Sequence, residues 1–319
     1  MRLRLTLIIL LAVSLTVAFS RPAFLGAAFA DNLSVKLDRI TFNLKKPNWF
    51  HLFVSVTDRA GAAVKDLDRA NFVVRQDGLS LNGISAAKPF FVTNRRLSFV
   101  ILLDHSEDMA GSLTLVRNGV KALVEAMGFG YEGTVVSYTG QPRVVAGPTR
   151  NAGLLVDRVM SLPASAGRPR LYDGLLFGLN YVKTGLGSDS NLDREVIILL
   201  SEGRDAGSQF SLKAVADKIQ EAGVNLFLIG YGEDAPDLKL LAGLAQAGGG
   251  GAFFSSGPDD MAGLFLTVAD RLKYQYILTG QSEAIRWDGR RHRLEVIVKS
   301  KLGGGSGQME FVAPAGPDR

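Results

Sequence analysis

The apolar stretch Leu97–Leu103 (LSFVILL) runs directly into the polar segment 104–109 (DHSEDM). An almost unbroken apolar run of this length is typical of a strand buried on both faces, as in the middle of a parallel sheet. The abrupt change to acidic and hydroxyl side chains predicts that the strand ends in a loop at residue 104. In open α/β sheets ligands gather where strands end, so this loop is the first candidate functional segment.

Similar apolar runs recur downstream at 134–138 (TVVSY), 195–200 (EVIILL) and 224–231 (VNLFLIGY). Between the runs, apolar residues recur at helical spacing. The three stripes are Val116, Val120, Leu123 and Met127; Leu212, Val215, Ala216 and Ile219; and Met261, Leu264, Phe265, Val268 and Leu272. Gly223 is a predicted helix stop. Strands that alternate with helices predict a doubly wound, mostly parallel sheet with helices on both faces.

The segments on either side of this unit have the alternating pattern of half-buried strands. Before it, Ile40, Phe42 and Leu44 alternate with polar residues, and Leu52, Val54 and Val56 recur at every second position; after it, Leu294, Val296 and Val298 do the same. Two or three strands cannot fold alone. We therefore predict one smaller all-β sandwich built from both segments, with the α/β unit inserted between them. The glycine-rich run 303–307 (GGGSG) is predicted to be a flexible connector.

The first thirty residues have the pattern of an export signal. Arg2 and Arg4 precede an uncharged apolar run over residues 5–20, and Ala28-Phe29-Ala30 offers a cleavage motif. The alternative is an uncleaved anchor, but this run is shorter than the ~20 residues that span a bilayer. No later stretch could span a membrane. We expect an exported bacterial protein, periplasmic or secreted.

The predicted domain organisation is therefore a signal peptide at 1–30, the first part of the sandwich at 31–95, the α/β domain at 96–274, strands that complete the sandwich at 275–312 and a flexible tail at 313–319.

Composition excludes several classes of function. The net charge of +5 depends on three arginines in the leader, and without the leader 33 basic residues face 31 acidic ones, which gives no electrostatic case for nucleic-acid binding. The absence of cysteine excludes disulfide scaffolds, cysteine-ligated zinc, iron–sulfur clusters and thiol catalysis. Three histidines are too few for a typical multi-histidine metal centre.

An ordered set of motifs resembles the von Willebrand factor type A family over about residues 97–273. They are the segment 104–109 after the first strand, Leu171-Tyr172-Asp173, 198–205 (ILLSEGRD), 227–232 (FLIGYG) and the stretch 248–254. The resemblance implies a Rossmann-like sheet that binds other proteins, in adhesion for example, without catalysis. In this family a metal-ion-dependent adhesion site begins with Asp-x-Ser-x-Ser at the first strand end.

Position by position, the resemblance to that metal site is partial. Asp104 and Ser106 match its first Asp and Ser, and Asp108 stands where the second Ser is expected. The later Asp of the motif corresponds to Glu202, which is one methylene longer. Its Thr corresponds to Pro169, which has no side-chain oxygen.

The resemblance implies a divalent cation at this site, and the oxygen ligands suit Mg²⁺ or Ca²⁺. Its candidate ligands are Asp104, Ser106, Asp108 and Glu202, with Asp173 as a further candidate. Three or four carboxylates would neutralise the ion, so that it attracts an acidic partner only weakly. The alternative is a vestigial site whose acids are solvated loop residues or helix caps. His105 is expected to pack or to face solvent rather than to be a ligand.

The predicted function is that of an exported, non-catalytic protein-interaction or adhesion module that binds another protein at the strand-end rim of the sheet. One alternative is a metal-free structural or assembly component of the bacterial envelope. A second is a serine-type hydrolase, which is disfavoured because Asp104, His105 and Ser106 are too close in sequence to form a triad and no G-x-S-x-G motif exists.

Overall fold

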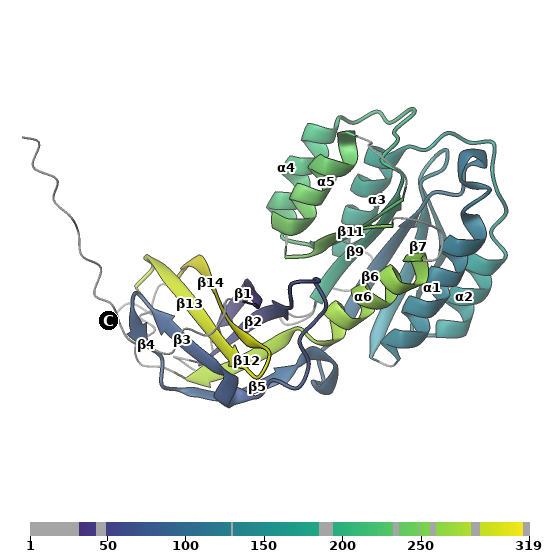
Figure 1. The fold of residues 1–319 in the computed structure, drawn as a ribbon. Coiled ribbons are helices and arrows are strands. Elements are labelled where there is room, and N and C mark those ends of the chain that lie inside the picture. The colour runs from purple at the N-terminus through teal and green to yellow at the C-terminus, as the bar shows by residue number, and fades with distance from the viewer. Residues whose placement is uncertain are drawn as a thin grey trace, which may run out of the picture.

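The computed structural model describes residues 32–42, 49–128, 130–184, 194–231, 236–247, 249–255, 260–281 and 288–314. They form an α/β domain and an all-β sandwich (Figure 1). The predicted signal peptide, 1–30, lies outside the described residues. None of the helices within the described ranges combines the length and apolar character needed to cross a bilayer.

The α/β domain is built on a six-stranded sheet in the order β11-β10-β9-β6-β7-β8. The strands are β6 (Leu97–Leu103), β7 (Tyr131–Ser137), β8 (Arg143–Thr149), β9 (Arg194–Ser201), β10 (Asn225–Gly230) and β11 (Gly251–Phe254). All neighbouring strands are parallel except β8, which pairs antiparallel with β7. Every residue of β6 is buried. The predicted doubly wound sheet is therefore confirmed.

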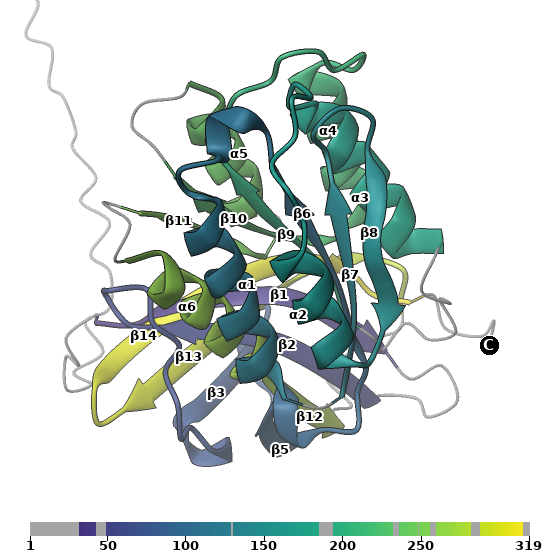
Figure 2. The ribbon, with the colours of Figure 1, turned by 90° about the vertical axis from the view of Figure 1, so that its right-hand side faces the viewer.

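Helices cover both faces of this sheet (Figure 2). One face carries α1 (Leu113–Met127), α2 (Ala152–Met160) and α6 (Met261–Lys273), and the other carries α3 (Leu171–Thr184), α4 (Leu212–Ala222) and α5 (Pro236–Ala247). The predicted stripes are the packed faces: Val116, Val120 and Leu123 have no exposed surface. Gly223 ends α4 in the left-handed conformation with φ 62°, as predicted.

The sandwich takes strands from both ends of the described chain. One sheet has the order β1 (Ser34–Phe42), β2 (Trp49–Thr57), β12 (Tyr276–Gln281), β5 (Ile84–Pro89). The other has the order β14 (Gly303–Val312), β13 (Arg291–Ser300), β3 (Phe72–Gln76), β4 (Leu79–Ser80). Short 3-10 turns lie at η1 (Arg69–Asn71), η2 (Phe90–Val92) and η3 (Glu107–Met109). Because β12 pairs with β2 and β5, and β13 pairs with β3, the predicted two-part sandwich is confirmed.

The glycine run 303–307 is not the flexible connector that its composition predicted. It forms the first half of β14 and pairs with β13 over its whole length. The physical reason is close packing against β1: a Cβ atom on Gly305 would lie 2.2 Å from the carbonyl oxygen of Leu33, and one on Gly307 would lie 2.2 Å from that of Val35. Only glycine permits this approach of two backbones.

The beginning of the predicted tail is also packed. Ala313 is 2% exposed, and its N–H donates to the carbonyl of Arg290. The carbonyl of Pro314 accepts a hydrogen bond from Gly289. Residues 315–319 lie outside the described residues.

His292 on β13 links two turns of the sandwich. Its Nδ1 lies 2.7 Å from Asp77 Oδ2 and its Nε2 lies 3.0 Å from Asp288 Oδ1. The hydrogen bonds to Asp288 and Asp77 raise the pKa of His292, while its side chain remains only 10% exposed. A ring that donates from both nitrogens must be protonated, so this cluster stabilises the fold through the charged form of the histidine.

Replacement of Gly307 by valine is expected to lower the free energy of unfolding by at least ~2 kcal/mol, because the new side chain collides with the backbone of Val35. Urea unfolding of the two proteins measures this difference. The matched control is Gly263→Ala in α6, where a Cβ meets no atom within 4 Å and alanine should stabilise the helix by up to ~1 kcal/mol. Equal stability of Gly307→Val and the parent would contradict the close packing of β14 on β1.

The stabilisation by His292 is expected to depend on pH. Because its folded pKa is raised, the contribution is complete below the ordinary histidine pKa of about 6.5 and is lost as the pH rises through the folded value. The difference in Tm between the parent and His292→Gln should therefore shrink from about pH 6 to about pH 8. His51→Gln is the control. Burial lowers the pKa of His51, so its contribution to stability changes with pH in the opposite direction. A difference that stays constant over this range would show that the ring acts only by packing.

Candidate functional site

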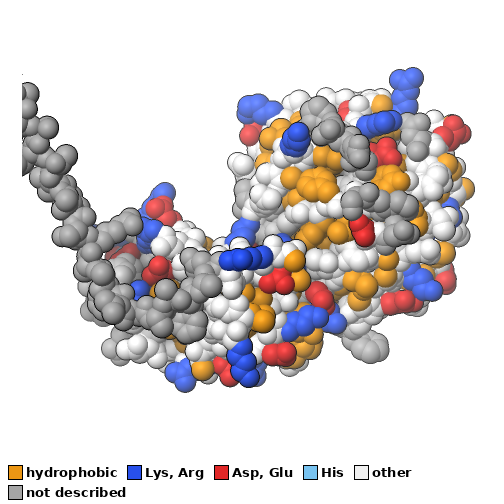
Figure 3. Space-filling model, viewed as in Figure 1, with side chains coloured by type: hydrophobic (Ala, Val, Ile, Leu, Met, Phe, Trp, Pro, Cys, Tyr) orange, Lys and Arg blue, Asp and Glu red, His pale blue; other side chains and the backbone are white. Residues whose placement is uncertain are grey.

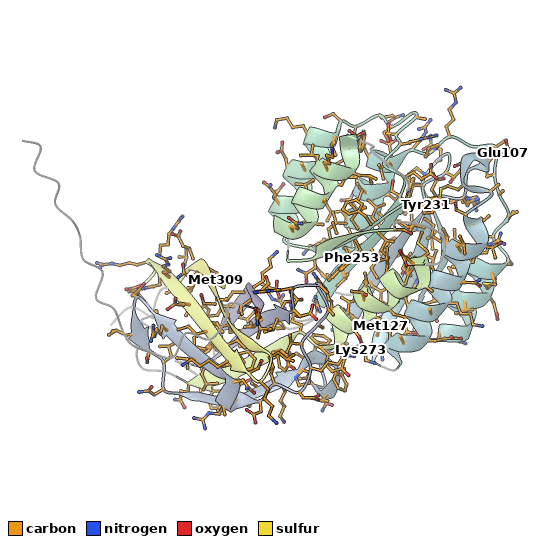
Figure 4. All side chains as sticks on the ribbon, in the orientation of Figure 1. Glu107, Met127, Tyr231, Phe253, Lys273 and Met309 are labelled. Atoms are coloured by element: carbon orange, nitrogen blue, oxygen red, sulfur yellow. The ribbon has the colours of Figure 1, made fainter. Side chains whose placement is uncertain are left out.

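The candidate site lies at the carboxyl edge of the α/β sheet. We call this edge the strand-end rim: it comprises the loops after β6, β7 and β9 (residues 104–112, 138–142 and 202–211) and the loop 161–170 before α3. Figure 4 labels Glu107 on this rim and Met309 on the sandwich. Glu107 lies at the end of the α/β domain that points away from the sandwich. The sandwich therefore does not cover the rim.

Backbone hydrogen bonds join these loops to one another. Ser165 N donates to His105 O at 2.8 Å, and Glu107 N donates to Ser165 O at 2.9 Å. Gly140 N donates to Arg168 O at 2.8 Å, and Ala206 N donates to Pro169 O at 2.9 Å. The rim is thus a connected framework rather than four independent loops, and it fixes the directions of the side chains that it carries.

Asp104 lies at the centre of the rim and is 6% exposed. Its Oδ1 accepts hydrogen bonds from Ser106 N at 2.8 Å and from Thr139 Oγ1 at 2.7 Å. The same Thr139 hydroxyl accepts the N–H of His105 at 2.8 Å. A carboxylate this deeply buried needs such donors, because an unpaired charge away from water is strongly destabilising.

Thr139 was missed in the sequence analysis. It directly follows the predicted strand 134–138, so the sequence could have placed it at the same sheet edge as Asp104. It also forms a backbone bridge with Pro169, the residue at the position of the family's Thr. A threonine hydroxyl is therefore present beside Pro169, supplied by a different loop.

Ser106 is 2% exposed, and its Oγ is buried without a hydrogen-bond partner among the described residues. Its backbone N–H is bonded to Asp104, which holds the residue beside that carboxylate. A buried hydroxyl of this kind normally has a partner. Among the described residues of the rim, this oxygen is therefore a candidate to contact a bound ligand.

Asp173, the further candidate ligand, is used to hold a neighbouring loop. Its Oδ1 accepts the N–H groups of Gln209 at 2.8 Å and Phe210 at 3.2 Å. Its Oδ2 lies 3.7 Å from Arg170 Nη1, and its side chain is 10% exposed. These contacts fix residues 209–210 against the start of α3.

Glu202 lies in the loop after β9 with its side chain 19% exposed, and its Oε2 is 3.9 Å from Arg204 Nε. The buried Tyr138, whose hydroxyl donates to Leu200 O at 2.7 Å, lies among several of the rim's acids. Burial raises the pKa of Tyr138, and the charges of Asp104, Glu202 and Asp205 raise it further. The carboxylates of Asp104, Glu202 and Asp205 therefore all act on the pKa of this buried phenol.

Asp108 lies in η3, but its side chain is outside the part of the chain that the structure describes. Among the described residues, no three histidine or carboxylate side chains are placed to hold a metal ion together. This does not disfavour Mg²⁺, which commonly uses one or two carboxylates and keeps several waters. Asp104 with the unpartnered oxygen of Ser106 suits such a hydrated ion.

The structure does not bring together the groups of a serine hydrolase. Ser106 Oγ and His105 Nε2 are both without hydrogen-bond partners among the described residues, so no Ser–His pair is formed. His105 Nδ1 is bonded to Pro163 O at 2.7 Å, and burial lowers the pKa of the ring. As expected, His105 packs within the protein: it is 1% exposed.

Three solved structures illustrate what the chain is similar to. One is described as von Willebrand factor type A from Catenulispora acidiphila, with 14% identity, 91% of this chain and 76% of that chain covered, and a TM-score of 0.49. Another is proximal thread matrix protein 1 from the mussel byssus with a zinc-occupied MIDAS motif, with 17% identity, 61% and 49% coverage, and a TM-score of 0.49.

A second crystal form of the mussel protein gives 15% identity, 56% and 48% coverage, and a TM-score of 0.47, so the chain spans about half the length of these byssus proteins. No curated protein sequence matches the chain.

The sequence model of the von Willebrand factor type A domain matches residues 99–264, which is a little over half of the chain. The matched region runs from β6 into α6 and contains the whole strand-end rim. The chain belongs to the von Willebrand factor type A domain family.

Proposed function

We propose that this protein is an exported protein-interaction module that binds a partner protein at the strand-end rim through a divalent cation. Membership of the family supports a role as a non-catalytic interaction module. Asp104 and Ser106 are the proposed direct ligands, and Asp108 and Glu202 complete the set through waters that the ion keeps. The chain would act outside the cytoplasm, in the periplasm or as a secreted protein.

The observation that carries the proposal is the buried oxygen of Ser106 next to Asp104, which has no hydrogen-bond partner among the residues that the structure describes. Both residues stand at the positions of the family's first Asp and Ser. Thr139 and the backbone of Ser106 orient the Asp104 carboxylate, so the protein has fixed the direction of its oxygens in advance. Ligands that are already oriented reduce the entropy lost on binding.

The charge balance at the rim supports capture of an acidic partner. Because Asp173 is engaged with backbone N–H groups, fewer carboxylates are free to neutralise the ion than the sequence alone suggested. A cation held mainly by Asp104 and the Ser106 hydroxyl keeps positive charge. When bound, it would supply that charge to a carboxylate of the partner.

Among the described residues, three exposed arginines around the rim have the same sign as the ion, against one exposed carboxylate, Glu107. Arg204 keeps 69% of its side-chain surface exposed, and Arg143 and Arg168 are also exposed. These arginines come from the loop after β9, the start of β8 and the loop before α3. They would steer an acidic segment toward the rim and strengthen its attraction at low salt.

Millimolar Mg²⁺ or Mn²⁺ is expected to raise the Tm by a few degrees relative to EDTA, since a ligand that binds only the folded state stabilises it by mass action. Ser106→Ala should lose this rise while keeping the parent Tm in EDTA, because the removed oxygen has no protein partner among the described residues. Ser161→Ala, at an exposed serine that begins the loop 161–170, is the matched control and should respond to the cation like the parent.

Ca²⁺ is tested in the same series, and Asp104→Ala should also lose the response. If no cation changes the Tm, or if Ser106→Ala responds as fully as the parent, the cation-binding part of the proposal is wrong and the metal-free assembly role is favoured.

The partner is sought by immobilising the protein and passing a bacterial envelope extract over it. A protein retained in Mg²⁺ should be released by EDTA and should not be retained by Ser106→Ala, whereas Ser80→Ala, at an exposed serine of β4 in the sandwich, should retain it. Retention that is indifferent to EDTA and to Ser106→Ala would locate the binding surface outside the rim.

A further inference from the structure

A second candidate site lies where the two domains meet, away from the strand-end rim. It is a cavity of about 600 Å³ lined by residues 36–39 of β1 on the sandwich side. On the α/β side it is lined by Arg194 and Asn225, the first residues of β9 and β10, and by Gln275 from the link to β12. Figure 3 shows the surface hollowed between the two domains, with Lys and Arg side chains beside the hollow. A volume of this size is typical of small-molecule sites.

Arg194 is buried in the wall of this cavity, with 3% of its surface exposed. Its Nε donates to Asn225 Oδ1 at 3.1 Å and its Nη1 donates to Leu272 O at 3.0 Å. Its Nη2 is buried without a hydrogen-bond partner among the described residues. The guanidinium is therefore held in place by two bonds while one donor group remains available.

Asp38 and Gln275 have the complementary arrangement. Gln275, 2% exposed, donates from Nε2 to Asp38 Oδ2 at 2.5 Å, and Ser55 Oγ donates to the same oxygen at 2.6 Å. The remaining oxygens, Asp38 Oδ1 and Gln275 Oε1, are buried and without partners among the described residues. The bond between the two side chains keeps both oxygens within one small region.

These unpartnered atoms are unusual, because nearly all buried polar groups in proteins form hydrogen bonds. The loss of solvent raises the pKa of Asp38 and lowers the pKa of Arg194 to about 10, the perturbation expected where charged groups line a binding cavity. One cationic donor and two acceptors are matched by a ligand that carries both an acceptor and an N–H donor.

The charges that line the cavity are unequal. Its cations are Lys36, Arg39, Lys183 and Arg194, and its carboxylates are Asp38 and Glu195. Lys183 and Glu195 pair with each other at 2.7 Å, so the remaining charge is positive. A ligand that has an amino group and more carboxylate groups than amino groups is negatively charged and would complement this positive charge.

We propose that the cavity between the domains binds an acidic amino acid, with a carboxylate on Arg194 Nη2 and the amino group on Asp38 Oδ1 and Gln275 Oε1. Lys36, whose ammonium group also donates to Gln246 O, lines the sandwich side and attracts the second carboxylate. Because both domains contribute to the site, the bound molecule would hold them together. This site is independent of the proposed cation at the rim.

Thermal unfolding and calorimetric titration of the whole protein with sodium L-glutamate test the proposal, with sodium chloride at equal ionic strength as the baseline. L-Glutamate should raise the Tm saturably. Glutarate, which lacks the amino group, and L-lysine, which has the opposite net charge, should bind at least tenfold more weakly. Asp38→Asn and Lys36→Gln should each weaken L-glutamate binding at least tenfold, whereas Lys301→Gln, an exposed lysine in the β13–β14 turn, should not.

Two variants are used so that a folding defect in one leaves the other informative. The proposal is overturned if L-glutamate causes no saturable shift, which would mean that ordered water alone fills the cavity. It is also overturned if glutarate binds as tightly as L-glutamate, or if Lys36→Gln and Asp38→Asn both bind like the parent. Added EDTA should leave the L-glutamate response unchanged, so this result and the cation result at the rim can fail separately.

Discussion

The structure depends on the complete burial of β6 and on how the chain leaves it. Seven consecutive residues of this strand are buried between β9 and β7, and the next residue is a carboxylate that is only 6% exposed. A charge at that depth requires fixed donors, which Thr139 and the backbone of Ser106 provide. The requirement to satisfy Asp104 therefore brings the loops after β6 and β7 together. The arrangement of the rim loops is therefore determined by the buried strand beneath them.

The parts of the fold that could be predicted are those whose signal is local. The strand Leu97–Leu103 and the stripe containing Val116 and Val120 each bury a continuous face, so their periodicity identifies them. Gly223 adopts the left-handed conformation that its position requires. The prediction for the run 303–307 was wrong because its glycines are needed for close packing against β1, which lies more than 260 residues away in sequence. Composition alone carries no information about that contact.

The sequence could place the candidate residues at one edge of the sheet, but it could not give their contacts. The family resemblance located Asp104, Ser106 and Glu202 on one sheet edge, and the strand ends do meet there. It could not show that Asp173 binds the N–H groups of residues 209 and 210, because that bond depends on the path of a distant loop. Nor could it show that Thr139 reaches Asp104 from the neighbouring strand. Side-chain direction is decided by tertiary contacts that no single motif contains.

The insertion of the α/β domain within the sandwich has a mechanical consequence. The first and last described strands, β1 and β14, lie against each other, and the N–H of Leu33 donates to Gly304 O. A pulling force that enters at residue 32 and leaves at residue 314 would act as shear between these two strands. The inserted domain is attached through the interior of the chain and would lie outside the path of that tension. A rim that holds a partner could thus keep its shape while the sandwich that anchors it is stretched.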